Sequence, residues 1–179
     1  MSPRNARPPR RLPGAPSSSR AVVPGRPSVA ALAGVVPWRQ PSALELVATS
    51  AVVAVVMLVL DLVWLGIIAV EIYNREMGTL KRPDIIIPAA VAFYAMYVVA
   101  TIRHAVLGAN DLADAGRRGA GLAVVAYGTY EFTNWAVIAD WPAALVPIDL
   151  LWGIALTTVV AVVGRATYQW FGRRGSHAP

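Results

Sequence analysis

The sequence lacks cysteine and contains only two histidines among its 179 residues. Without cysteine there are no disulfides, no thiolate metal sites and no cysteine nucleophiles. His104 lies near one end of an apolar segment and His177 in a basic tail. We therefore expect no metal site and no serine–histidine–aspartate triad. No glycine-rich phosphate loop is present, and we expect no cofactor.

Charged residues are scarce as well, at 15% of the chain, whereas 56% of the residues are hydrophobic. A soluble domain of this size has too small a core to bury so much apolar surface. The apolar residues also occur in long blocks, which is typical of membrane proteins. We therefore predict an all-α, polytopic membrane protein whose first partner is the lipid bilayer.

Acidic residues are absent from residues 1–41, which carry seven arginines among Pro, Ser, Gly and Ala. Such a segment has too little apolar surface to offset the entropy lost on ordering, so we predict a disordered tail over residues 1–43. Its composition disfavours a secretory signal peptide. It fits an organellar transit peptide, a cytoplasmic tail on anionic headgroups, or an extension without function. Aromatic residues are not interleaved with the arginines, and we expect no nucleic-acid partner.

Residues 44–165 contain four apolar segments long enough to cross a bilayer, because about 20 helical residues span the hydrocarbon core. We predict four transmembrane helices packed as a compact antiparallel bundle. Pro147 lies inside the last of them and predicts a kink or a locally open backbone. Residues 108–118 are predicted to form a loop and residues 166–179 a short basic tail. The expected helices cover residues 46–70, 85–107, 119–139 and 141–164.

The distribution of basic residues predicts the orientation of the bundle. With four spans, the two termini and the second loop lie on one side of the membrane. That side carries thirteen Lys and Arg residues, and the other side carries three. The positive-inside rule then places both termini in the cytoplasm, and we expect a multi-pass protein of the cell inner membrane.

Asp61, Glu131 and Asp149 each interrupt a different predicted span. In the predicted topology all three lie about 12–14 Å from the outer ends of their helices, without a basic residue at that depth. Buried carboxylates of this kind are costly in a membrane and usually face a bundle interior. The first and last of these acids share a D-L-x-W pattern, which is either a trace of an inverted repeat or chance.

Donors for these acids are available in the predicted spans. Tyr127, Tyr130, Glu131 and Asn134 follow one another at helical spacing on a single stripe. Thr129, Thr133 and the glycines are equally explained as helix-packing residues, and the tryptophans as interfacial anchors. The predicted polar site comprises Asp61, Trp64, Tyr94, Tyr97, Tyr127, Tyr130, Glu131, Thr133, Asn134, Asp149 and Trp152.

Three classes of function remain open. In the first, the acidic layer in the outer half of the bilayer binds or conducts protons, a small cation or a cationic ligand; for transport we expect a homodimer, because four helices are few. The first alternative is a structural or accessory subunit, in which the polar layer fixes helix register. The second alternative is a lipid- or isoprenoid-modifying membrane enzyme with a carboxyl acid or base.

The ordered motifs also resemble a known family. They include the D-L-V-W-L-G run beginning at Asp61, then Tyr73 and Gly78, the Y-G-T-Y-E-F-T-N-W-A run beginning at Tyr127, Trp141-Pro142, and D-L-L-W-G from Asp149. Over about residues 44–165 the chain is similar to the bacterial four-helix predicted membrane proteins of domain of unknown function 2177. The family pattern has Asp where this chain has Glu131. The resemblance implies a four-helix inner-membrane protein and no particular activity.

Overall fold

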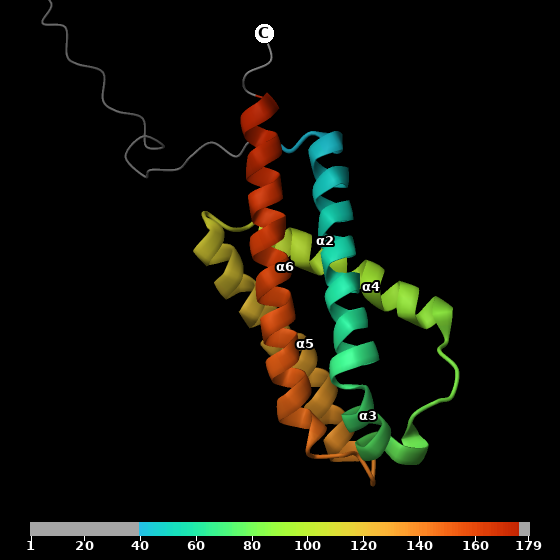
Figure 1. Ribbon diagram of the computed structural model, residues 1–179. Helices are drawn as coiled ribbons and strands as arrows, with labels where there is room; N and C mark the ends of the chain where they lie inside the picture. The colour runs from blue at the N-terminus through green and yellow to red at the C-terminus, as the bar shows by residue number, and fades with distance from the viewer. Residues whose placement is uncertain (1–39, 176–179) are drawn as a thin grey trace, which may run out of the picture. The chain divides into compact units, whose positions relative to one another are not determined.

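The computed structural model describes residues 40–175, and these residues form helices without any β-strand. The all-α prediction is thereby confirmed for this part of the chain. The prediction of a disordered tail concerns residues outside it. The main helices are α2 (Ala43–Val63), α3 (Val70–Met77), α4 (Ile87–Thr101), α5 (Leu112–Val137) and α6 (Leu145–Gly175), shown in Figure 1. The shorter elements are the π-helices η1 (Trp64–Ile68) and η3 (Ile102–Val106) and the 3-10 helix η2 (Gly78–Leu80).

Three of the helical segments are long and apolar enough to cross a membrane: Ala43–Ile68, Ile87–Val106 and Leu145–Arg174. No other helix in residues 40–175 meets these criteria. α5 is long enough, but the polar stretch from Tyr127 to Asn134 lowers its mean hydropathy. The chain is thus suited to integration into a membrane, while the fourth span, the antiparallel bundle and the cytoplasmic termini stay predictions.

Helix starts are set by local side chains. Ser42 and Glu45 form a capping box, in which each side chain accepts a hydrogen bond from the backbone of the other, at 3.2 and 2.9 Å. Asp111 caps α5 by accepting from the Asp114 backbone N–H at 2.7 Å. α5 therefore begins inside the segment that we expected to be a loop.

α6 also differs from the expected helix. It begins at Leu145, so Trp141 and Pro142 lie in the connection, and it continues to Gly175 through the expected tail. Pro147 consequently lies in the first turn, where its missing N–H has no intrahelical acceptor to lose. The expected kink inside a long span is for this reason wrong.

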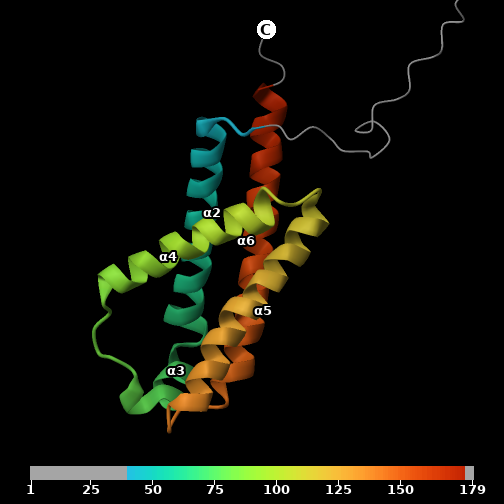
Figure 2. The same ribbon diagram turned by 180° about the vertical axis from the view of Figure 1, so that it is seen from behind.

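The helices pack around α6. α5 makes the largest interface with α6, and α2 the next largest. α5 and α6 approach closely at Gly119, where a Cβ atom would lie 2.7 Å from the Thr157 carbonyl oxygen. α4 contacts its neighbours mainly through its C-terminal half and η3, and it runs obliquely to α2 and α6 (Figure 2).

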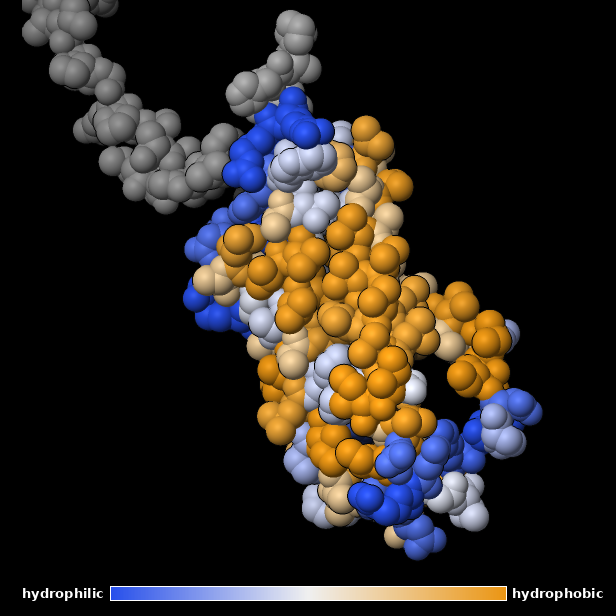
Figure 3. All heavy atoms as spheres, in the orientation of Figure 1, coloured by the Kyte–Doolittle hydropathy of each residue, from blue (hydrophilic) through white to orange (hydrophobic). Residues whose placement is uncertain are grey.

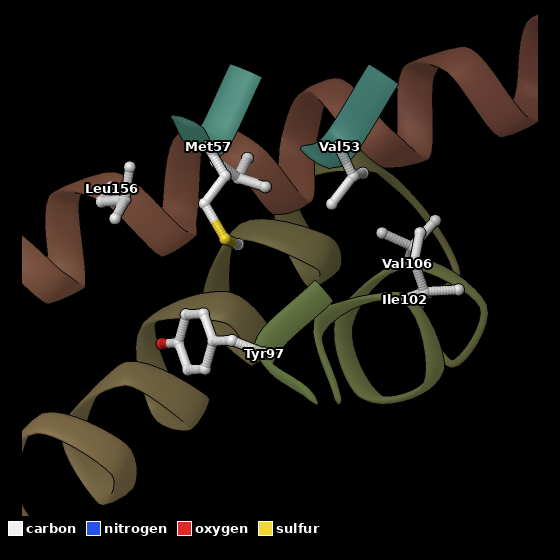
Figure 4. Packing of buried hydrophobic residues seen from close by; sticks show 7 residues of the cluster. Val53, Met57, Tyr97, Ile102, Val106 and Leu156 are labelled. Atoms are coloured by element: carbon white, nitrogen blue, oxygen red, sulfur yellow. The ribbon is translucent and has the colours of Figure 1, made fainter. Parts of the chain in front are cut away.

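A small apolar core joins α2, α4, η3 and α6. Tyr97 belongs to this core, and its hydroxyl is hydrogen bonded to Thr157 at 2.9 Å. The face of the molecule seen in Figure 3 is largely apolar along the middle of the helices and hydrophilic towards their ends. This distribution suits a lipid environment. The buried cluster contains Val53, Met57, Tyr97, Ile102, Val106, Leu156 and Val160, most of them labelled in Figure 4.

Candidate functional site

Asp61 occupies the first of two buried acidic centres. Its side chain projects from α2 and is only 6% exposed. One carboxylate oxygen accepts a hydrogen bond from the Tyr94 hydroxyl of α4 at 3.0 Å, and the other accepts from the Trp152 indole N–H of α6, also at 3.0 Å. The Asp61 centre, defined by these three residues, therefore joins three helices through neutral donors.

Glu131 and Asp149 form the second centre, which we call the carboxyl pair. Glu131 of α5 is completely buried, and Asp149 of α6 is 8% exposed. Oε2 of Glu131 accepts from the Trp141 indole N–H at 3.0 Å, and Oδ1 of Asp149 accepts from the Tyr73 hydroxyl. The two carboxyl groups are also close enough to interact electrostatically.

The second carboxylate oxygen of Glu131 shows that the carboxyl pair requires a proton. Oε1 of Glu131 is buried and has no donor among the described residues as long as both acids are ionised. Two carboxylates are both acceptors, so a hydrogen bond between them requires a proton on one. A proton on one of the two acids would therefore allow Glu131 and Asp149 to form a hydrogen bond.

Stacked indole rings connect the two centres. The rings of Trp64 and Trp152 are nearly parallel, with centroids 4.4 Å apart and planes inclined by 4°. Trp152 donates to Asp61. The buried indole N–H of Trp64 has no hydrogen-bond partner in the described residues, but it lies near the Tyr73 hydroxyl, which donates to Asp149. The tryptophans of the two D-L-x-W segments thus lie between the two acids of the same segments.

Two other predicted tyrosines line the same region. Tyr127 contacts Tyr97 edge to face, with ring centroids 6.2 Å apart. It fits against α6 because position 153 is glycine, since a Cβ atom there would overlap the Tyr127 ring. Tyr130 is 53% exposed and makes an edge contact with Trp141 at 5.6 Å.

Thr133 and Asn134 are not brought into either centre. Thr133 is exposed, and its hydroxyl donates to the carbonyl of Thr129 in its own helix. Asn134 is half-buried near the end of α5, where its carbonyl accepts from the Ile138 N–H at 2.8 Å. The polar stripe therefore contributes mainly through Glu131 and Tyr127.

The sequence pattern missed two donors, Tyr73 and Trp141. Tyr73 lies in the polar connection after the first span, and helical spacing gives no indication that this connection folds back onto Asp149. Trp141 has the composition of an interfacial anchor, although its N–H binds Glu131. Both belong to the motifs of the family resemblance, which was the only available signal.

Basic residues form no ion pair with these acids in residues 40–175; the ion pairs there lie at the surface, as between Arg118 and Asp114. The same residues contain no group of three or more His, Asp or Glu side chains arranged for a metal ion. The carboxyl pair is consequently a site without a fixed countercharge.

All three acids lie near the same end of their helices, where α2 and α5 approach their C-termini and α6 begins (Figure 1). At 1.5 Å per residue, Asp61 is about 10 Å from the end of η1, Glu131 about 9 Å from the end of α5, and Asp149 about 6 Å from the start of α6. The acids are thus closer to the ends of their helices than the sequence predicted, because η1 ends at Ile68, α5 ends at Val137 and α6 starts only at Leu145.

Comparison with known proteins agrees with this architecture. No curated protein and no solved structure matches the chain. Residues 46–166, which include all the helices that carry the acids, match the family described as "Predicted membrane protein (DUF2177)". The match covers more than half of the sequence, and the chain belongs to this family of predicted membrane proteins of unknown function.

Proposed function

We propose that the protein is an integral membrane protein whose carboxyl pair, Glu131 and Asp149, holds a proton and exchanges it with one membrane surface. The observation that carries this proposal is the burial of two interacting acids, with Oε1 of Glu131 lacking a donor in the described residues when both are ionised. The proposal makes the pair, rather than the whole acidic layer, the functional element.

Elementary electrostatics favours a shared proton. Two ionised carboxylates in contact repel each other, and burial penalises each charge further. One proton removes one charge and creates a hydrogen bond between the acids, as in other carboxylate dyads that share a proton. Tyr73 and Trp141 then provide donors for the other oxygens.

A metal ion would require more oxygen ligands than this pair supplies, because hard cations take six or more. An organic cation would have to separate the two carboxyl groups. A proton needs no such rearrangement, and we therefore place it ahead of the other cations of the first hypothesis.

The Asp61 centre supports a second role, as structural register. Both of its oxygens already accept hydrogen bonds, from α4 and from α6. Interhelical polar contacts of this kind hold membrane helices together. We propose that Asp61 fixes the arrangement of α2, α4 and α6 around the pair. The structural role of the first alternative is then carried by the Asp61 centre alone.

The primary test is infrared spectroscopy of the purified protein in lipid nanodiscs. A protonated carboxyl has its own C=O stretching band, and we expect one that disappears as pH rises. Glu131→Gln and Asp149→Asn should each remove it, whereas Asp84→Asn, which changes an exposed acid, should not. A spectrum without this band, or a band unaffected by both substitutions in the pair, would refute the proposal.

We further propose four spans, with both termini on the cytoplasmic side of a bacterial inner membrane. α5 is about 39 Å long, and its buried acid faces α6. Three spans would place the termini on opposite sides, and four on the same side. Reporter fusions at the two ends, active only in the cytoplasm or only outside it, distinguish these topologies.

A further inference from the structure

α3 is the least anchored helix in the described part of the chain. All of its residues are exposed or half-buried, and it packs mainly against η1 and η2, its neighbours in sequence. It begins after an irregular residue, Ala69, and ends at Gly78, whose φ is 48°. Segments with so little buried surface open at low free-energy cost.

One side chain attaches α3 to the acidic site. Tyr73 donates its hydroxyl proton to Oδ1 of Asp149. The other polar contacts given for α3 stay local: Arg75 binds its neighbour Glu76, and Asn74 accepts from Lys81. The attachment to α6 thus depends on the state of the Asp149 carboxyl group.

α3 also lies where a lid is needed. Asp149 is about 6 Å from the start of α6, yet only 8% of it is exposed. The Tyr73 hydroxyl reaches this carboxyl from α3, and burial together with Asp149 raises the pKa of the Tyr73 hydroxyl. Tyr73 accordingly remains a donor over the whole physiological pH range.

We propose that α3 is a lid over the carboxyl pair, held closed by the hydrogen bond from Tyr73 to ionised Asp149 and released when Asp149 takes up a proton. This proposal rests on the proton-holding function proposed above and names the element that controls access to it. In the closed state the proton of the pair is on Glu131, which donates to Asp149.

The strength of the hydrogen bond provides the switch. A hydroxyl bound to a carboxylate makes a bond roughly twice as strong as one to a neutral acceptor. The titratable groups facing Asp149 are Tyr73 from α3 and Glu131 from α5, with Tyr130 of α5 close to both acids. A second proton on the pair leaves no charge to hold Tyr73, so lower pH favours the open lid.

η1 provides the hinge. Trp64 at its start is held by the stack on Trp152, whereas α3 begins after Ala69 at its other end. π-helical turns of this kind are frequent at functional sites, and they interrupt the regular hydrogen bonding of the helix. Motion of α3 about this segment would leave the Asp61 centre intact.

Distance measurements by double electron–electron resonance test the lid directly. The chain has no native cysteine, so spin labels attach only to introduced sites. Arg75→Cys labels the exposed face of α3, and Ala144→Cys labels the connection before α6. In nanodiscs we expect one short distance at high pH and a second, longer distance that becomes populated as pH falls.

Tyr73→Phe in the labelled protein keeps the ring and removes the hydroxyl. We expect the longer distance to be populated even at high pH, whereas Tyr168→Phe, a half-buried tyrosine far along α6, should preserve the pH dependence. A single short distance in Tyr73→Phe at every pH overturns the lid while the infrared band of the pair can persist. Asp149→Asn has no carboxylate to hold Tyr73, and we expect the longer distance at every pH, whereas Glu131→Gln keeps Asp149 and should keep the pH dependence. These results support the lid, and an absent infrared band in the wild type then refutes the proton-holding function separately.

Discussion

The Asp61 centre and the carboxyl pair solve the problem of a buried acid in different ways. Asp61 has two neutral donors from two other helices, so its oxygens need nothing further. Among the described residues, Glu131 accepts a hydrogen bond only from Trp141, and Asp149 accepts one only from Tyr73. Each of these acids therefore also depends on the other. The comparison indicates that burial alone does not identify a functional acid. A buried oxygen without a donor, such as Oε1 of Glu131, still requires a proton or another partner.

The largest effect that we expect separates these centres by the number of protons taken up on acidification. In lipid nanodiscs with a pH-sensitive dye in the surrounding buffer, Glu131→Gln and Asp149→Asn should lose the proton uptake of the pair, because neither variant retains two carboxyl groups that share a proton. Asp61→Asn should keep most of this uptake, since Asp61 lies outside the pair. Equal loss in all three variants would mean that the centres act as one site.

Trp152→Phe is expected to have the next largest effect, on stability. Phenylalanine preserves much of the ring stack on Trp64 but removes the N–H that binds Asp61. An acceptor left unsatisfied in the membrane should cost about 1–2 kcal/mol. Trp141→Phe is the matched change at the pair and should cost only about 0.6 kcal/mol, an average interhelical bond, because Trp141 lies in a connection.

Unfolding in mixed micelles of increasing denaturing detergent measures both values. The comparison between the centres would fail if Trp141→Phe were the more destabilising of the two substitutions, because the pair would then carry the structural role.

Much of this arrangement could be predicted from the residues. Long apolar blocks specify membrane helices, and an acid inside such a block specifies a buried polar site, so the predictions for Asp61, Glu131 and Asp149 followed from composition alone. Donors on the same spans, Tyr94 and Trp152, were also identified, and the structure places them on Asp61.

The sequence could not predict which of the three acids lie together. Depth along a helix can be counted, but rotation about its axis and the path of a connection depend on packing. Tyr73 reaches Asp149 only because the chain reverses after η1. Thr133 shows the opposite error, since its position near Glu131 in sequence leaves it on the outer face of α5.

Gly153→Ala tests the close packing of the Tyr127 ring of α5 against α6. The added Cβ atom would overlap the Tyr127 ring, which itself contacts Tyr97, so the helices must separate. Overpacking of this kind costs about 1–3 kcal/mol. Gly121→Ala is the control, because nothing lies within 4 Å of a Cβ atom there, and it should be neutral. The same detergent titration measures both variants, and equal stability would mean that the close packing at Gly153 is unimportant.

Glu131→Asp should have a smaller effect, and on geometry rather than on protonation. Aspartate is one methylene shorter than glutamate, and it keeps a carboxyl group near Asp149. The shorter side chain should lose the bond from Trp141 or the contact with Asp149, but not the shared proton. We expect the infrared band to persist with a shifted frequency, and its loss would show that reach, rather than charge, defines the pair.

The smallest effect concerns Asp114, a half-buried acid at the start of α5 that has the basic partner that the buried acids lack. The Asn110 backbone N–H and the Arg118 guanidinium hold the pKa of Asp114 below its ordinary value. A lowered folded-state pKa stabilises α5 above the unfolded pKa of about 3.9, and this contribution disappears as pH falls through the folded value.

Hydrogen exchange of the first turn of α5 should therefore accelerate on acidification in the wild type. In Asp114→Asn the exchange should already be fast, with no acid-dependent step beyond the intrinsic change. Protonation of Asp114 at low pH loosens the start of α5, because it removes a charge that has cationic partners. Protonation of the carboxyl pair at low pH opens the proposed lid, because it removes a charge that has no cationic partner. An identical response of α5 and α3 to pH would contradict this difference between Asp114 and the pair.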